Sequence, residues 1–167
     1  FVLSRAVVVA IPAGLITWIF ANIYVGDLSI LSHVANFLDP IAKFIGLDGF
    51  ILLAFILGFP ANEIVLPILL MSYLATGSMI EFDNLSALGE VLKNNGWTYL
   101  TAINTMLFSL LHWPCATTLL TIKKETGSNK WTLVGFLMPT AIAFLVCFIS
   151  TCAVSYTHLR AHETLAN

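Results

Sequence analysis

Long hydrophobic segments without charged side chains constrain this sequence most. Residues 6–25, 94–122 and 131–159 contain no charged side chain, and residues 49–80 contain only Glu63. A bilayer core about 30 Å thick is crossed by about 20 apolar helical residues. Because the chain is 59% hydrophobic and only 10% charged, its composition excludes an ordinary soluble domain. We therefore expect an all-α, polytopic membrane helix bundle.

Shorter amphipathic segments separate these hydrophobic runs. Residues 6–25 contain Pro12 and predict a kinked transmembrane helix. Residues 28–45 repeat apolar side chains every three or four positions, and the Asp39–Pro40 pair predicts that they form two short helices at the membrane surface. A third short surface helix is expected over residues 85–92, capped by Asp83 and ended at Gly96.

The distribution of basic residues predicts a broken or re-entrant segment. The loop at residues 123–130, "KKETGSNK", is lysine-rich and is expected to face the cytoplasm, as is Arg5. The first three hydrophobic segments lie between Arg5 and this loop, and three full crossings would place Arg5 and the loop on opposite sides of the membrane. Residues 49–80 and 97–122 are too long for one straight span at about 1.5 Å per residue, and each contains a central proline. At least one is therefore expected to be re-entrant or discontinuous, with residues 49–80 favoured.

The first proline break lies in "GFPANE", residues 58–63. Gly58 is expected to end one half-helix and Pro60 to start the next, which leaves the Ile56 carbonyl without its donor. Asn62 and Glu63 then fall in the first turn. An intramembrane carboxylate costs at least about 2.5 kcal/mol on insertion scales, which favours a functional role in binding a cation. The alternative is a structural cap at the positive end of the half-helix.

The second proline break lies in "HWPCATT", residues 112–118, around Pro114. A polar stripe within an arc of about 80° leads to it, with Asn104 and Cys115 at its edge. Its members are Thr98, Thr101, Thr105, Ser109 and His112. One interpretation is a hydrophilic path that ends in imidazole and thiol ligands suited to a borderline transition metal. The other is hydrogen bonding between packed helices.

The remaining cysteines and the net charge point to no further site. Cys147 and Cys152 lie in the last hydrophobic segment and are expected to be packing residues. With three cysteines and no CxxC pair, neither a disulfide framework nor a zinc site is indicated. The net charge of −2, without a basic patch, argues against nucleic acid as a partner.

Four stretches of the sequence closely resemble the C-terminal membrane region of the ferrous iron transport protein B (FeoB) family. They are "VVVAIPAGLITW", "LGFPANEIVLPILLMSYL", "NGWTYLTAINTMLFSLLHWPCATTLLTIKKETGSNKW" and "GFLMPTAIAF". The resemblance implies part of an iron(II) importer of the bacterial cytoplasmic (inner) membrane, with "GFPANE" and "PCATT" in its second gate-like region. It also implies that Cys115 belongs to the metal path.

The same resemblance implies parts that this sequence does not contain. Family members carry an N-terminal GTP-binding domain and a first gate region, and no P-loop of the GxxxxGKS type occurs here. We therefore expect a non-enzymatic fragment, with GTP and magnesium bound only by the missing domain. Its expected partners are the lipid bilayer, iron(II), the G domain and first gate region of the same full-length chain, and further copies of itself in a possible homo-oligomer.

The C-terminal tail departs from the family pattern. Its "SYTHLRAHET" core, residues 155–164, resembles translated sequencing-adapter sequence. We expect residues 1–154 to form the transmembrane gate region and residues 155–167 to be a non-native tail. His158 and His162 beside Glu163 are accordingly not interpreted as a metal site.

Two other functions fit the same segments. In the first, the broken helices cradle a small organic solute, such as a nucleoside, in an ion-coupled carrier. In the second, the chain is a non-transporting module that anchors a complex, with Glu63 as a structural cap. Exposure of Glu63 at the interface would favour the anchoring module.

Overall fold

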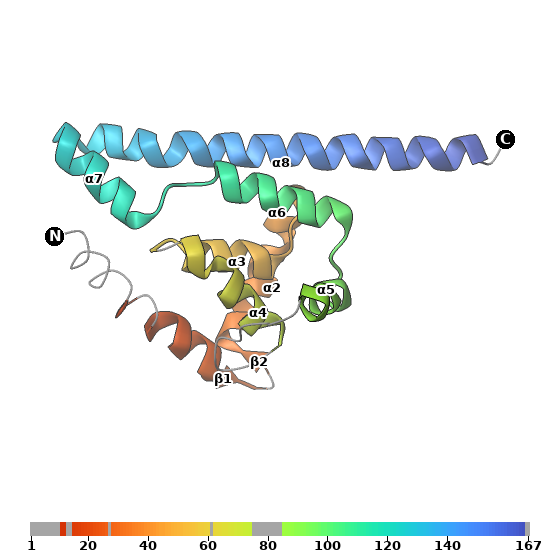
Figure 1. Ribbon diagram of the computed structural model, residues 1–167, viewed down its shortest axis with the longest axis horizontal. Coiled ribbons are helices and arrows are strands. Elements are labelled where there is room, and N and C mark those ends of the chain that lie inside the picture. The colour runs from red at the N-terminus through yellow and green to blue at the C-terminus, as the bar shows by residue number, and fades with distance from the viewer. Residues whose placement is uncertain (1–10, 13–14, 27, 61, 75–84, 166–167) are drawn as a thin grey trace.

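A computed structural model describes residues 11–12, 15–26, 28–60, 62–74 and 85–165, with side chains up to Tyr156. The predicted all-α fold is confirmed, apart from a small antiparallel hairpin of β1 (Tyr24–Val25) and β2 (Leu28–Ser29). Pro12 is described, but the kink expected there involves residues 13–14 and those before residue 11, which lie outside this description, as does Asp83. The long helix α8 (Asn129–Leu165) lies along one side of the molecule, with α6 (Tyr99–Leu111) and α7 (Ala116–Thr126) next to it (Figure 1).

Helix α2 (Ile30–Phe44) is one continuous helix with Pro40 inside it, so the predicted division at Asp39–Pro40 is wrong. Ser29 caps its start by accepting the Ser32 amide at 3.2 Å. Both halves of α2 pack on the following helix, and its buried side chains are Leu31, Ala35 and Ala42. This packing outweighs the one helical hydrogen bond that Pro40 removes.

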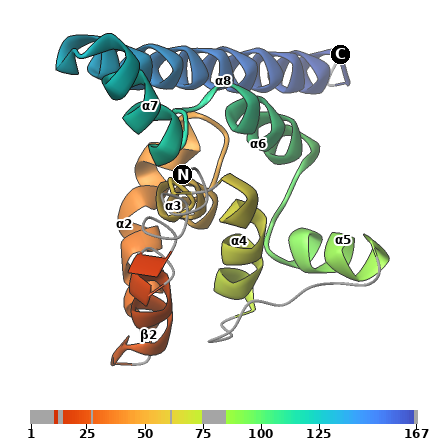
Figure 2. The ribbon, with the colours of Figure 1, turned by 60° about the vertical axis from the view of Figure 1, so that its left-hand side comes forward.

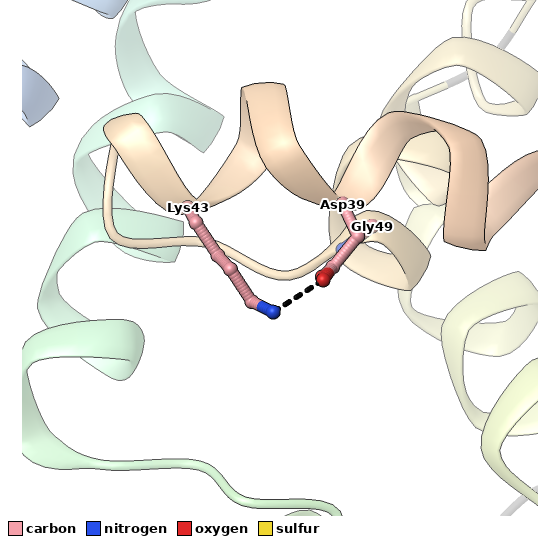
Figure 3. Close-up of polar contacts among 3 residues, drawn as sticks. All are labelled: Asp39, Lys43 and Gly49. Atoms are coloured by element: carbon pink, nitrogen blue, oxygen red, sulfur yellow. Dashed lines mark hydrogen bonds and ion pairs between the residues drawn. The ribbon is translucent and has the colours of Figure 1, made fainter.

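Asp39 contributes to the turn between helices instead of capping a helix. Its carboxylate pairs with Lys43 one turn further along α2 and accepts the amide of Gly49 at 3.2 Å (Figure 3). Gly49 begins α3 (Gly49–Leu57), which is bent by 107° relative to α2. The two helices therefore form an angled pair, held at its corner by the Asp39 side chain.

Residues 49–80 are broken, as predicted for the favoured segment. Helix α3 ends at Leu57, the 3₁₀ turn η1 covers Asn62–Ile64, and α4 covers Val65–Tyr73. Helices α3 and α4 lie side by side next to α2, and α5 (Leu85–Asn94) lies to one side of them (Figure 2). The expected surface helix over residues 85–92 is thus present, and its connection ends at Gly96 in a left-handed conformation, φ 83°.

Two of the described helical stretches are long and apolar enough to cross a membrane. They are Tyr99–Thr126, which contains α6 and α7, and Asn129–Tyr156 within α8. The bent pair of α2 and α3 would make a third if it acts as one span. The lysine-rich loop joins the first two, and Gly127 ends α7 in the left-handed conformation, φ 61°. Helix α8 continues into the tail, so the division between residues 154 and 155 stays a prediction.

A buried asparagine ties three parts of the core together. The Asn104 side chain on α6 is fully buried, and its Nδ2 donates to the Ile45 carbonyl and to Thr151 Oγ1, both at 2.9 Å. Gly46, with φ 68°, gives this amide room, because a Cβ there would lie 2.3 Å from Asn104 Nδ2. Asn104 therefore connects the end of α2 with α6 and α8.

Candidate functional site

The first proline break is a tight turn in which α4 starts against the end of α3. Gly58 caps α3, and a Cβ on it would lie 2.4 Å from Val65 Cγ2. Pro60 lies in the turn and does not start the next helix, which begins with η1; that prediction is wrong. The Ile56 carbonyl is not free either, because it accepts the Phe59 amide at 3.3 Å. The chain turns on itself here before it resumes a helix.

The polar residues of this break lie on the surface of the described chain. Asn62 and Glu63 occupy the first turn after the break, as the sequence predicted, although that turn is a 3₁₀ turn. Both side chains are exposed. The carboxylate of Glu63 is thus placed at the start of a half-helix and directed away from the packed core.

The second proline break separates α6 from α7. Helix α6 ends at Leu111 with His112 as its C-cap, and Cys115 is the N-cap of α7 with φ −61° and ψ 159°. Residues 112–115 are not helical, and the backbone is extended at His112 and Cys115. The segment from residue 97 to residue 122 is therefore discontinuous as well, so both candidate segments are broken.

The two breaks touch each other through their backbones. The amide of Ala116, the first residue of α7, donates to the carbonyl of Phe59 at 3.0 Å. The first amides of a helix have no partner within the helix, and Phe59 satisfies one of them from the other break. This bond brings "GFPANE" and "PCATT" together, although they are more than fifty positions apart in the sequence.

The thiol of Cys115 lies beside this junction with two hydroxyl groups around it. Its Sγ is 3.0 Å from Thr117 Oγ1 and 3.1 Å from Thr118 Oγ1. Cys115 is half-buried. The break thus holds one soft donor atom and two hydroxyl oxygens within one turn of helix.

The imidazole of His112 is buried, with only 7% of its surface exposed. Its Nδ1 lies 3.0 Å from the Ser109 carbonyl. Among the described residues its Nε2 has no hydrogen-bond partner, and the same holds for Nε1 of Trp113, the next residue. Two adjacent side chains at this break therefore each keep one polar atom buried and unpaired.

The predicted polar stripe on α6 uses its hydroxyl groups locally. Thr98 caps α6 by accepting the Thr101 amide at 3.2 Å, and Thr105 Oγ1 donates to the Thr101 carbonyl at 2.7 Å. Ser109 is exposed. Asn104, at the edge of the stripe, faces the core. The structure does not gather these side chains with His112 into one polar cluster.

An apolar groove of about 470 Å³ runs beside both breaks. Phe59 from the first break and Trp113 from the second line it, together with residues of α2, α3 and α8. The other lining residues are Leu38, Ile41, Leu52, Ile56, Phe136, Thr140 and Phe144. The rings of Trp113 and Phe136 stack with centroids 6.0 Å apart. Aromatic and aliphatic side chains thus dominate the groove.

Within the described residues, no group of three or more His, Cys, Asp or Glu side chains is placed to hold a metal ion. Glu63 at the first break is exposed, whereas at the second break His112 is buried and Cys115 is half-buried. The described chain thus brings the two breaks together without assembling their ligand candidates into one closed coordination site.

Comparison with known proteins identifies the family. A family model described as nucleoside recognition, Gate, matches residues 3–129, which is most of the chain. This chain belongs to the Gate family.

Curated relatives place this Gate segment within larger proteins. It is 32% identical over 130 residues to the Fe(2+) transporter FeoB of Leptospira biflexa, covering 74% of this chain and 18% of that protein. It is 34% identical over 92 residues to FeoB of Staphylococcus aureus, and the match covers 55% of this chain and 12% of that protein. A Porphyromonas gingivalis Fe(2+) transport protein A/FeoB fusion protein is 26% identical over 137 residues, and the match covers 77% of this chain and 16% of that protein.

The resemblance to the membrane region of FeoB proteins is therefore confirmed. The Gate segment spans less than a fifth of the length of these relatives. No solved structure gives a significant match.

A polar network that the sequence did not predict connects the start of α3 with α4 and with Trp97 before α6. Asp48 caps α3 by accepting the Ile51 amide at 2.7 Å, and it also accepts a hydrogen bond from the Tyr73 hydroxyl. Trp97 Nε1 donates to the same hydroxyl at 2.9 Å. The N-cap signal of Asp48 before an apolar run was present in the sequence. Its partners on α4 and before α6 carried no local signal.

The last two cysteines of the Gate segment differ from each other. Cys147 is fully buried, as expected for a packing residue, but its Sγ also lies 3.5 Å from the Asn104 carbonyl. Cys152 is exposed in the described chain, so the packing role predicted for it is wrong there. The difference arises because α6 covers one side of α8 and leaves the other open.

Proposed function

We propose that this chain is part of the membrane permease of a GTP-dependent iron(II) importer, and that its two proline breaks form part of the ion pathway and gate. The observation that carries the proposal is the 3.0 Å bond from the Ala116 amide to the Phe59 carbonyl, which joins the breaks bearing Glu63 and Cys115. Broken helices at membrane depth expose backbone and side-chain ligands to a passing ion. The Fe(2+) transporter names of the relatives supply the ion.

The proposed ligands combine hard and soft donors. Glu63 and Asn62 offer carboxylate and amide oxygens, and Cys115 and His112 offer a thiol and an imidazole. Soft donors favour iron(II) over magnesium, whereas oxygen donors keep binding weak enough for the ion to leave. Gly58, Pro60 and Pro114 shape the breaks. Thr98, Thr101, Thr105 and Ser109 stay candidates for lining the approach along α6.

The remaining parts of the importer would come from the full-length protein. We propose that a G domain, which binds GTP and magnesium, and a first gate region belong to the same full-length chain. The protein would cross the bacterial inner membrane several times and could form homo-oligomers. The Gate segment would conduct iron(II) and control its passage, and the G domain would bind and hydrolyse GTP.

Two substitutions in the full-length protein test the proposal. Cys115→Ser and Glu63→Ala should each lower the initial rate of radioactive iron(II) uptake into cells by about tenfold or more, because each removes a charged or soft ligand. Cys152→Ser is the matched control, since its thiol is exposed on α8, and it should transport normally. Membrane expression is measured for all three. If both test variants take up iron(II) at the wild-type rate, Cys115 and Glu63 are not part of the ion pathway.

A carrier of an organic solute is the second candidate. The aromatic groove at the breaks favours it, because rings such as Trp113 and Phe136 can stack on a planar base. This function predicts that the full-length protein binds a nucleoside such as uridine without added metal. Calorimetry that detects no uridine binding, together with iron(II) uptake, would exclude it.

An anchoring module is the third candidate, and the exposure of Glu63 favours it. In such a module Glu63 is a structural cap and the breaks conduct nothing. Unchanged assembly and absent iron(II) uptake by the wild-type protein would support the anchoring module over the importer.

A further inference from the structure

The buried imidazole of His112 is surrounded by aromatic rings. The ring centroids of Phe55 and Phe108 lie 4.9 and 5.7 Å from it, and that of Trp113 lies 5.5 Å away. Phe55 is also in edge contact with Phe108, with centroids 4.9 Å apart. Phe55 is 2% exposed and Phe108 is fully buried. The imidazole is thus sealed in an apolar pocket.

The hydrogen bonding of His112 leaves a lone pair directed into this apolar surrounding. Its Nδ1 faces the Ser109 carbonyl, which can only accept, so Nδ1 carries the proton and Nε2 carries a free lone pair. This tautomer is the one in which Nε2 can ligate a metal. Among the described residues neither this atom nor Trp113 Nε1 has a partner. Leaving both unpaired destabilises the packed state, and an apolar residue in place of His112 would avoid that penalty.

One of the three rings belongs to a different part of the chain from His112. Phe108 and Trp113 are close to His112 in sequence and move with the end of α6, whereas Phe55 belongs to α3. Helix α3 has only nine residues and lies between two points where the chain turns, the 107° bend after α2 and the turn at Gly58. A short helix between two turns can shift as a unit once the hydrogen bonds at its start, from Gly49 to Asp39 and from Tyr73 to Asp48, are released. Phe55 would then leave His112 while the other rings stay.

We propose that Phe55 is a hydrophobic plug that closes the pathway at His112, and that movement of α3 away from α6 uncovers His112 Nε2 for the passing ion. This inference rests on the proposed function and adds a gating residue to it. The described conformation is the closed one. In the open conformation the imidazole Nε2 bonds to water or to the ion and the indole N–H donates to water, which offsets the weaker apolar packing after Phe55 withdraws.

Modification by diethyl pyrocarbonate tests the plug, because this reagent reacts with the unprotonated nitrogen of imidazole. His33 is a matched internal reference. Its Nδ1 also faces a backbone carbonyl, that of Ser29 at 3.1 Å, but its side chain is exposed. In the resting full-length protein, peptide mass spectrometry should show His112 reacting at least about tenfold more slowly than His33, as expected for a group that reacts only on local opening.

Three variants and one wild-type measurement extend the test. Phe55→Ala should raise the rate at His112 by about tenfold and leave His33 unchanged, and Phe55→Leu should raise it less. Phe50→Ala is the control, because Phe50 is on the same helix but packs on Tyr73, with centroids 5.6 Å apart. In the wild-type protein, adding GTP without iron(II), so that no ion occupies Nε2, should bring the rate at His112 toward that at His33. This last measurement needs no variant to fold.

The inference is overturned if His112 reacts as fast as His33 at rest, or if it stays protected with GTP alone in a wild-type preparation that takes up iron(II) once the ion is supplied. It is equally overturned if a folded Phe55→Ala protein protects His112 as the wild type does. Absence of iron(II) uptake by the wild type would instead contradict the proposed function, and the resting protection of His112 would still be measured. The two failures are therefore distinguishable.

Discussion

At the first proline break the polar side chains face outward, whereas at the second they are packed inside. Asn62 and Glu63 are exposed in η1, but His112 and Trp113 are each 7% exposed and keep an unpaired polar atom. Both breaks follow the same local chemistry, a proline that interrupts a helix. The difference arises from tertiary packing, since α3 and α8 cover His112 and Trp113, whereas η1 packs on the core through Ile64 and leaves Asn62 and Glu63 exposed. Tertiary packing therefore decides whether the polar side chains at a proline break are exposed or buried.

Asn104 on α6 is also a buried polar side chain whose Oδ1 has no partner among the described residues, but its Nδ2 is hydrogen-bonded. Replacing it with leucine should lower the free energy of unfolding by about 3 kcal/mol, since the Ile45 carbonyl loses its donor and stays buried. Denaturant titration of the purified chain in detergent measures this change in the free energy of unfolding.

Asn95→Leu is the matched control for Asn104→Leu. Its side chain is exposed and bonds only to the Val91 carbonyl at 2.8 Å, so the change should be within about 0.5 kcal/mol. If the two substitutions had equal effects, the Asn104 connection between α2, α6 and α8 would not stabilise the fold, and α6 would not be held in place at the second break.

Gly58 tests whether the first break is as tightly packed as the structure indicates. Gly58→Ala should lower the free energy of unfolding by about 1–3 kcal/mol, because the new Cβ would meet Val65 Cγ2. In the control Gly89→Ala on α5, the new Cβ meets no other described part of the chain within 4 Å beyond its own helix backbone and chain neighbours, and the helix should gain up to about 1 kcal/mol. The same detergent assay measures both. A neutral Gly58→Ala would mean that the first break is loose.

The local parts of this fold were predictable from sequence, and the long-range parts were not. Gly58 and Pro60, and likewise Pro114, indicate interrupted helices through their backbone chemistry alone, and both interruptions are present. The continuity of α2 through Pro40 was not predictable, because it depends on packing against α3. The bond from Ala116 to Phe59 and the partners of Asn104 join positions far apart in sequence, and a single sequence carries no signal for them.

The candidate site shows the same limit. The sequence indicated Glu63, Cys115 and His112 as ligand candidates from their residue types, and the structure places all three at the breaks. It could not indicate that His112 is buried under Phe55, because Phe55 is one of several apolar residues in "FILLAFIL" and nothing in its position distinguishes it.

The central claim is that the two breaks act as one gate through the contact between Phe59 and Ala116, and Ala116→Pro tests it most directly. Proline at the first position of α7 keeps the helix, and Cys115, with φ −61° and ψ 159°, already has the conformation that a following proline requires. The substitution therefore removes the amide that bonds to Phe59 and little else. Ala116→Gly, which keeps the amide, is the control.

The measurement is iron(II) entry into proteoliposomes that contain the full-length protein, without nucleotide. Because one such hydrogen bond contributes about 0.5–1.5 kcal/mol, its loss should shift the closed state toward the open one and raise entry about two- to tenfold in Ala116→Pro. Ala116→Gly should match the wild type. Equal entry through Ala116→Pro and wild-type proteins, with both folded and active with GTP, would contradict the claim that this contact holds the gate closed.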